Sequence, residues 1–554
     1  MNSRFYQSER FLAKHELEGS EKTARALSVK STLPMNHLPL TTPALLEAYE
    51  WITPLLLLAV LAVSMLLRDG RQAAEGAAGV ARLFFAVGLM FSFGVMLAGP
   101  MRIELAAWGP ARLALLVDPL SALMLVLVSF LGVVVTRYAI NYLDGDPGQA
   151  RFSRWLVLAL TSVLALVLSS NLLMFAAAWI ATSLSLHQLL TFYRERPAAV
   201  MAARKKFVIS RLADASMITA LVLVWHGHGT WEFHELFANP AGPYAGLLAG
   251  FLVFAAMLKS AQFPFHSWLP DTLETPTPVS ALMHAGIINA GGFLIVRLSP
   301  LVTQSPTALN TLALFGAFTA LFASVIMMTQ TSIKKSLAWS TVAQMGFMML
   351  QCGLGAFALA MMHIVAHSLY KAHAFLSSGS VVNLAKSAWT PVGRPSAHPL
   401  VVLGSLAVST LMGFCFAAAL GVTLQNDPGT MLLIAVFIMA MAHLLWTLWS
   451  SSMRQRLILR GLGIVVAATT ACFAVHAGFE HLLAASLPAY APIRSGVEHA
   501  VMILVALLFL AVLIFQSQLP AWAARPAFAR LYVHASNGFY IGTLFNRITG
   551  KFLF

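Results

Sequence analysis

Charged residues and cysteines are scarce in this sequence. Asp, Glu, Lys and Arg together make up 10% of the 554 residues, whereas the AVILMFWYC set makes up 59%. A soluble protein of this size needs a far more charged surface, so a soluble globular fold is excluded. The three cysteines, Cys352, Cys415 and Cys472, lie in apolar runs and form no CxxC pair. Disulfides and a cysteine metal cluster are therefore not expected, and we expect no metal site and no cofactor.

The sequence contains many long apolar runs. A helix crosses ~30 Å of hydrocarbon with ~20 residues, and windows of roughly 16 to 28 mainly apolar residues recur along the whole chain. The windows are 51–67, 81–99, 113–138, 154–169, 171–192, 203–225, 244–263, 277–298, 308–329, 336–353, 355–382, 398–423, 430–450, 456–477 and 500–517. Because the connections are short, the sequence predicts an all-α polytopic membrane protein with about 14–15 transmembrane helices.

The charge balance fits a membrane topology. The net charge is +14, and the basic residues gather in alternate loops, for example 194–206, 334–335, 454–460 and 525–551. The positive-inside rule then places the 194–206 loop and the C-terminus in the cytoplasm, as expected for an inner-membrane protein. The charge points to membrane lipids as partners and argues against nucleic acid.

Three regions follow from these patterns. Residues 46–520 are expected to form the membrane domain. Residues 1–45 are polar and lack the apolar core of a signal peptide, so we expect a disordered or non-native tail, with Met35 as an alternative start. Residues 521–554 are expected to form an amphipathic cytoplasmic tail, either an interfacial helix or a docking surface. The candidate docking residues are Trp522, Phe528, Tyr532, Phe539 and Tyr540.

Two of the 21 acidic residues fall within predicted spans. Asp118 begins a predicted helix, where the helix dipole favours a carboxylate. Asp214 lies near the middle of another span, and Arg211 stands three residues earlier on the same face, so the two can pair. A charge at bilayer depth is costly and marks an ion pathway, while a purely structural pair is the alternative.

Lys259 stands at the end of an apolar run and precedes a helix break. Four prolines follow it, Pro264, Pro270, Pro276 and Pro278. Broken helices at membrane depth are tolerated where they line protein or a watery cavity. A lysine beside such a break is a candidate proton-binding site, because buried lysines exchange their proton readily. Snorkelling toward the headgroups is the alternative.

A later apolar helix carries a polar stripe. His363, His367 and Lys371 are spaced i, i+4 and i+8, so they share one face. His284 and His443 are further histidines within apolar windows. Because histidine exchanges protons near neutral pH, the pattern predicts a cation relay. A metal pair is the alternative for the first two histidines, although no HExxH glutamate is near.

The stretch 259–298, KSAQFPFHSWLPDTLETPTPVSALMHAGIINAGGFLIVRL, resembles the antiporter-like subunits of respiratory complex I and of the Mrp cation/proton antiporters. The runs ARKKFVISRLADASMI and HIVAHSLYKAHAFLSSGSV resemble the same family. The resemblance implies two inverted five-helix repeats, each with a discontinuous helix, and cation translocation along a central polar axis. Within it, Lys259 matches the lysine of the broken helix, His284 the histidine of the next helix, and Lys371 the later lysine.

The sequence departs from this family at two positions. The family usually has a glutamate directly after the tryptophan of its fifth helix, but here Ile180 follows Trp179. Ala417 stands where the terminal lysine of the family is expected. We therefore predict that Asp214 takes the role of the acid and that His443 serves near the far end.

The segment SLSLHQLLTFYRERPAAVMAARKKFVISRLAD resembles the membrane subunit of the bacterial DAB inorganic-carbon accumulation systems. That resemblance implies a large cytoplasmic, zinc-containing, carbonic-anhydrase-like partner that hydrates CO2 to bicarbonate, driven by protons or sodium ions crossing the membrane subunit. The chain has no Cys/His/Asp zinc set, so it is not expected to be an enzyme by itself. The alternatives are a proton-pumping subunit of complex I or a membrane hydrogenase, and an Mrp-type sodium/proton antiporter subunit.

Overall fold

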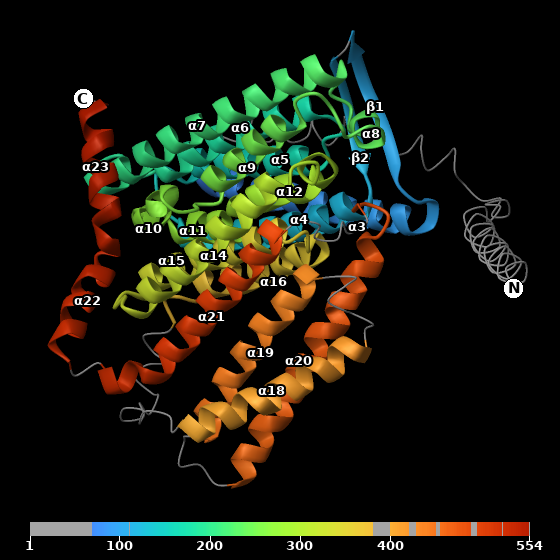
Figure 1. The fold of residues 1–554 in the computed structure, drawn as a ribbon. Coiled ribbons are helices and arrows are strands. Elements are labelled where there is room, and N and C mark those ends of the chain that lie inside the picture. Colours follow the sequence, from blue (N-terminus) through green and yellow to red (C-terminus); the bar gives the residue numbers. More distant parts are fainter. Residues whose placement is uncertain are drawn as a thin grey trace, which may run out of the picture. The chain divides into compact units, whose positions relative to one another are not determined.

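The computed structural model describes residues 69–109, 111–380, 399–419, 428–449, 455–488, 496–522 and 525–552 (Figure 1). The predicted tail 1–45 and the window 51–67 lie outside these residues. Ten helices in the described part are long and apolar enough to cross a membrane, and two shorter apolar helices cover 245–259 and 400–415. The prediction of a polytopic helical membrane protein is confirmed.

The elements follow the predicted windows closely. The first part contains α3 (Gly70–Ala98), β1 (Met101–Trp108), β2 (Ala111–Val117), α4 (Pro119–Tyr142), α5 (Gln149–Val167), α6 (Leu172–Leu190), α7 (Pro197–His228), α8 (Phe233–Ala238) and α9 (Ala245–Lys259). The middle part contains η1 (Phe265–Ser267), α10 (Trp268–Asp271), η2 (Thr272–Glu274), α11 (Thr277–Ala285), η3 (Ile287–Asn289), α12 (Ala290–Arg297), α13 (Ser299–Val302), α14 (Pro306–Met328), α15 (Ile333–Gly353) and α16 (Phe357–Leu376). The last part contains α18 (Pro399–Ala419), α19 (Pro428–Trp449), α20 (Gln455–Leu483), α21 (Gly496–Trp522), α22 (Pro526–Ser536), η4 (Gly538–Tyr540) and α23 (Ile541–Phe552).

A β-hairpin departs from the helical prediction. β1 pairs antiparallel with β2 across a turn at Gly109, whose φ of +60° suits glycine. The sequence predicts one span over 113–138, but its first residues belong to β2. The helix begins only after Asp118, because this carboxylate accepts the Ser121 backbone N–H at 2.8 Å and caps α4. Arg297 of α12 then donates to both carboxylate oxygens of Asp118, at 2.7 and 2.9 Å.

The helix break predicted after Lys259 is present. α9 ends at Lys259, three short helices cover the proline-rich segment, and a regular helix resumes only at Thr277. A second irregularity, η3, separates α11 from α12. The apolar window of Thr277–Arg297 is 94% buried inside the protein. The discontinuous helix therefore runs through protein and not along lipid, as irregular backbone at membrane depth requires.

α14 and α15 approach each other closely. A Cβ atom added to Gly346 of α15 would lie 2.8 Å from the carbonyl oxygen of Gly316 of α14. Small residues allow helix backbones this contact in membrane proteins, where large side chains would hold them apart. α15 in turn packs against α16, which carries the predicted polar stripe.

The C-terminal helices pack on the ends of earlier helices (Figure 1). α22 contacts α14, and α23 contacts α7 and η1. The side chain of Lys205 is 0% exposed, and its ammonium lies 2.5 Å from the Asp271 carboxylate of α10 and 3.4 Å from the Gly542 carbonyl oxygen of α23. One lysine thus joins the tail to the segment after the helix break. The predicted basic loop is also shorter than 194–206, since α7 begins at Pro197.

Candidate functional site

Lys259 ends α9 in the interior of the protein. Its ammonium donates hydrogen bonds to the Ser183 hydroxyl at 2.6 Å and to the Trp179 backbone carbonyl at 3.2 Å. The ammonium also lies 4.3 Å from the centre of the Trp179 ring, in a cation–π contact. Lys259 is only 6% exposed. The side chain therefore points into protein and does not snorkel toward the headgroups.

Lys206 is a second buried lysine beside this site. The charge pattern of the sequence predicts this residue in a cytoplasmic loop. Its ammonium donates to the Ser183 backbone carbonyl at 2.8 Å, so Lys206 and Lys259 bind the two oxygens of one residue. Lys206 was missed because it belongs to a basic run, and such runs usually mark the cytoplasmic side of a membrane protein. The spacing of Lys206 and Asp214 is i, i+8, the same as that of His363 and Lys371. This spacing could have indicated that Lys206 shares a helix face with Asp214.

Asp214 and Arg211 form an ion pair on α7. Arg211 Nη2 lies 2.6 Å from Asp214 Oδ2, and the two side chains are 35% and 6% exposed. The positive charges of Lys259, Arg211 and Lys206 all act favourably on this carboxylate. An acid thus lies among three cations next to α6, the helix on which Ile180 stands in place of the family's glutamate.

The second group of polar side chains comes from α11, α15 and α16. His284 Nδ1 lies 3.1 Å from Thr341 Oγ1. His367 Nε2 donates to the backbone carbonyl of His284 at 3.1 Å, which joins α16 to α11. Lys371 is fully buried and donates to the Ser340 hydroxyl at 2.8 Å. Each of the two relay lysines predicted from the sequence therefore binds a serine hydroxyl on a neighbouring helix.

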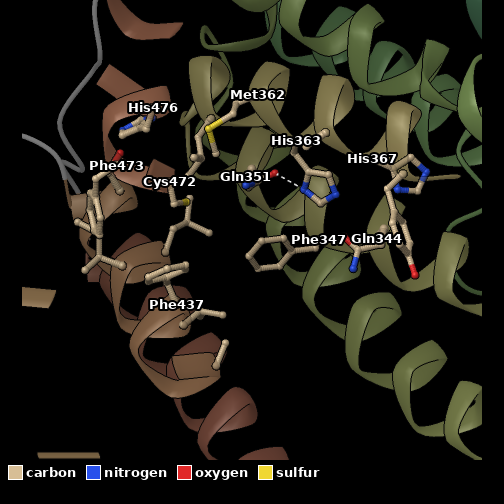
Figure 2. A pocket seen from close by; sticks show the side chains of 18 residues that line it. Gln344, Phe347, Gln351, Met362, His363, His367, Phe437, Cys472, Phe473 and His476 are labelled. Carbon is tan, nitrogen blue, oxygen red and sulfur yellow. Dashed lines mark hydrogen bonds between the residues drawn. The ribbon is translucent and has the colours of Figure 1, made fainter. Parts of the chain in front are cut away.

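His363 and His367 border a cavity (Figure 2). His363 Nδ1 lies 2.9 Å from Gln351 Oε1, and the rings of the two histidines are 6.0 Å apart. The cavity has a volume of about 440 Å3 and is lined by residues of α15, α16, α19 and α20. It far exceeds the roughly 10–15 Å3 that one water requires, so water has room to reach the histidine stripe.

The two positions expected at the far end lie apart from this stripe. His443 is a half-buried residue of α19, and its ring contacts the Trp446 ring edge-on with centroids 4.6 Å apart. His443 is not one of the residues that line the cavity. Ala417 lies in α18. The role of His443 in the relay stays a prediction.

The aromatic residues of the tail divide between internal contacts and the surface. The rings of Trp522 and Phe528 lie 5.7 Å apart, and Phe539 packs on α14. Tyr532 and Tyr540 remain 50% and 45% exposed. The tail thus packs on the membrane helices and still presents aromatic side chains. Its docking role stays a prediction.

Family models match two parts of the chain, and the longer one contains the helix break, Lys259 and the histidine stripe. The transmembrane model of NADH:quinone oxidoreductase and Mrp antiporters matches residues 169–390. The model of the N-terminus of complex I chain 5 matches residues 109–153. Fold and site therefore define a multi-pass, antiporter-like membrane protein.

Solved structures share the fold. A chain of the Mrp complex from Dietzia sp. has a TM-score of 0.63 and 24% identity, over 86% of this chain and 57% of that chain. The membrane-bound sulfane sulfur reductase, an archaeal respiratory membrane complex, has a TM-score of 0.55 and 16% identity, over 90% of this chain and 98% of that chain. At these identities the likeness concerns the fold alone.

Curated relatives are more similar in sequence. The probable inorganic carbon transporter subunit DabB2 of Halothiobacillus neapolitanus is 40% identical over 465 residues, or 81% of this chain and 82% of the relative. The probable subunit DabB of Hydrogenovibrio crunogenus is 41% identical over 314 residues, or 55% of this chain and 60% of the relative. The chain belongs to the family of antiporter-like, ion-translocating membrane subunits that includes these proteins. With such relatives it is a multi-pass protein of the bacterial inner membrane, and the relatives themselves are named as subunits.

Proposed function

We propose that this chain translocates protons across the inner membrane as a subunit of a complex that accumulates inorganic carbon. The observation that carries the proposal is the buried Lys259 ammonium, which binds Ser183 beside a helix break and lies within electrostatic range of Asp214. A charge at this depth is costly unless it faces the protein interior and serves a pathway. The names of the DabB relatives supply inorganic carbon as the substrate class.

The Lys259 site is built to exist in two protonation states. The Ser183 hydroxyl accepts a hydrogen bond from the ammonium, and the same hydroxyl can rotate and donate to the neutral amine. Asp214 attracts the protonated form, whereas Lys206 on the other oxygen of Ser183 repels it. A small movement of either neighbour therefore changes how tightly the proton is held.

The discontinuous helix joins this site to the histidine stripe. α12 contacts α9 on one side and α15 and α16 on the other, while α11 packs on α16. We therefore propose that His284 on α11 passes the proton between the two buried lysines, Lys259 and Lys371. An imidazole can accept a proton on one ring nitrogen and release one from the other, which suits it to the middle of a relay.

The hydration of CO2 is proposed for a partner and not for this chain. The partner would be a large cytoplasmic, zinc-containing, carbonic-anhydrase-like subunit, and proton flow through this chain would drive hydration in one direction. The residues of this chain then bind, hold and pass the ion, with sodium as the alternative cation. The cytoplasmic tail, with Tyr532 and Tyr540 half exposed, is the proposed docking surface.

The substitution Lys259→Ala tests the proposal. The chain and its partner are co-expressed in a bacterial host that lacks carbonic anhydrase and grows only at raised CO2. The wild-type pair should restore growth at ambient CO2, and Lys259→Ala should not, with the same amount of complex recovered from the membrane. Lys335→Ala, at an exposed position of α15, is the control and should restore growth. Growth with Lys259→Ala would contradict the proposal.

A second candidate function rests on a different relative. The chloroplastic NAD(P)H-quinone oxidoreductase subunit 5 of Acorus calamus is 38% identical over 278 residues, or 48% of this chain and 38% of that protein. It favours a proton-pumping subunit of an electron-transfer complex, and an Mrp-type sodium/proton exchanger is the third candidate. Mass spectrometry of proteins that co-purify with the chain separates them: a zinc protein, quinone-reducing subunits or several small antiporter subunits.

A further inference from the structure

Two cavities meet at one histidine of α20. The first is the cavity of about 440 Å3 that His363 and His367 border. The second has a volume of about 370 Å3, shares Leu359, Thr430 and His476 with the first, and adds Glu480. Because three residues line both, the cavities adjoin. His476 and Glu480 are absent from the relay that the sequence predicts.

His476 and Glu480 are paired across one turn of α20. His476 Nε2 lies 3.2 Å from Glu480 Oε1, and the two side chains are 6% and 48% exposed. Both ring nitrogens of His476 are buried and neither makes a hydrogen bond in the described part of the chain, so Nε2 meets Glu480 through proximity and charge. In Figure 2, His476 and Cys472 of α20 lie on the opposite side of the cavity from His363 and His367 of α16. A buried polar atom that borders so large a cavity has room for a water partner.

The second cavity lies at the outer end of the helices. α15 begins at the basic residues Lys334 and Lys335, which the positive-inside rule places in the cytoplasm. Its other end, and the turn 355–357 that follows, therefore lie on the outer side. That turn lines the second cavity together with Leu487 and Pro488. Glu480 thus stands between the cavity and the outer aqueous phase.

We propose that His476 and Glu480 form the outer end of the proton pathway, an inference that rests on the function proposed above. Glu480 takes up a proton from the outer aqueous phase and passes it to Nε2 of His476. His476 releases a proton from Nδ1 into water in the first cavity, and His363 accepts it at Nε2, an atom also without a partner in the described residues. At each step, the side chain that takes up one proton also releases one proton. The pair occupies the role of the terminal lysine, where this chain has Ala417.

An apolar molecule such as a lipid acyl chain is the competing occupant of the first cavity. Many of its lining side chains are apolar, for example Phe347, Phe437 and Phe473. An acyl chain would, however, leave the ring nitrogens of His363 and His476 buried without partners, at a cost of about 1–3 kcal/mol for each. Water satisfies both, so the polar atoms at the two ends favour a wet cavity.

Proton flux tests the two residues directly. His476→Gln and Glu480→Gln preserve size and hydrogen bonding but cannot carry the proton. In the complete complex, reconstituted into vesicles of bacterial phospholipid and supplied with CO2, each should lower the rate of proton uptake about tenfold or more. His481→Gln, at an exposed position of the same helix that lines neither cavity, should leave the rate unchanged.

Lys259→Ala, measured in the same vesicles, separates the two proposals. Loss of flux in Lys259→Ala with normal flux in His476→Gln and Glu480→Gln would overturn the assignment of the outer end alone. Normal flux in all three variants would overturn the proposed function as well.

Cys472 reports on water in the cavity without reference to flux. The double substitution Cys352→Ser and Cys415→Ser leaves this cavity-lining residue as the single cysteine of the chain. A charged, membrane-impermeant methanethiosulfonate, added to the outer side of sealed vesicles, should modify Cys472 and react more slowly from the inner side. Modification only by membrane-permeant N-ethylmaleimide would indicate an apolar filling and would overturn the outer pathway.

Discussion

Arg297 and Asp118 provide a buried ion pair outside the proposed relay. Their side chains are 3% and 10% exposed, and the guanidinium binds both carboxylate oxygens. Removal of one partner leaves an uncompensated charge, so Arg297→Leu should lower the free energy of unfolding by about 3–5 kcal/mol. The measurement is thermal unfolding of the detergent-solubilised protein. Arg71→Leu is the control. It breaks a pair with Glu75 in which both side chains are 57% exposed, and it should change the free energy of unfolding by less than ~1 kcal/mol. An equal loss of unfolding free energy in Arg297→Leu and Arg71→Leu would refute the argument.

Asp214 offers a second test at the scale of single residues. Asp214→Asn removes the charge and keeps the shape, so proton flux should fall about tenfold. The fold should survive, because Arg211 is 35% exposed and can be solvated without its partner. Flux in reconstituted vesicles is the readout, Asp214→Glu should restore most of it, and the exposed Glu195→Gln is the control. Normal flux in Asp214→Asn would remove Asp214 from the relay.

Single charged residues could be found from the sequence when they interrupt an apolar run. Lys259 and the stripe around His367 were predicted in this way, and the structure places them in the protein interior. Glu480 was missed because the predicted window ends at residue 477, whereas α20 continues to Leu483. Only the true helix end puts Glu480 one turn after His476 on the same face.

At the scale of elements, the contact between α14 and α15 depends on glycine. Gly346→Ala would bring a methyl group against the backbone of α14, and overpacking of this kind costs about 1–3 kcal/mol. The variant should melt at a lower temperature than the wild type in detergent. Gly79→Ala is the matched control, because a Cβ there meets nothing within 4 Å and alanine favours a helix. A destabilised Gly79→Ala with an unaffected Gly346→Ala would contradict the packing argument.

The helices were predictable from apolar windows, but the hairpin was not. Its second strand is an apolar run that continues into α4, so window length alone could not separate them. Long-range contacts help to hold it: Arg102 Nη2 donates to Glu232 Oε2 at 2.7 Å, and Asn171 Nδ2 donates to the Arg112 carbonyl at 2.7 Å. Partners so distant in sequence leave no local pattern. The one local signal was Asp118, whose cap marks where the helix begins.

At the scale of the whole molecule, the tail is the proposed docking surface for the cytoplasmic partner. The double substitution Tyr532→Ala and Tyr540→Ala removes two half-exposed aromatic side chains of the kind that dominate binding hot spots. Recovery of the partner in a pull-down should fall about tenfold, or by about 1.4 kcal/mol. Trp108→Ala, an exposed aromatic position of the outer hairpin, should not change it. Unchanged recovery with both tyrosines absent would leave the tail as an interfacial helix.

With the tail as the proposed docking surface, the Lys205 ammonium would connect partner binding thermodynamically to the proposed ion site. It binds Asp271 in the segment after the helix break and lies near the Gly542 carbonyl in the tail. α23 cannot leave its place without uncovering a lysine that is otherwise fully buried and changing the electrostatic field at α10. A partner that shifts α23 would therefore change the surroundings of Asp271 in the segment that follows Lys259. If that change alters proton binding at Lys259, reciprocity requires that loading or unloading of Lys259 alter partner affinity by the same factor.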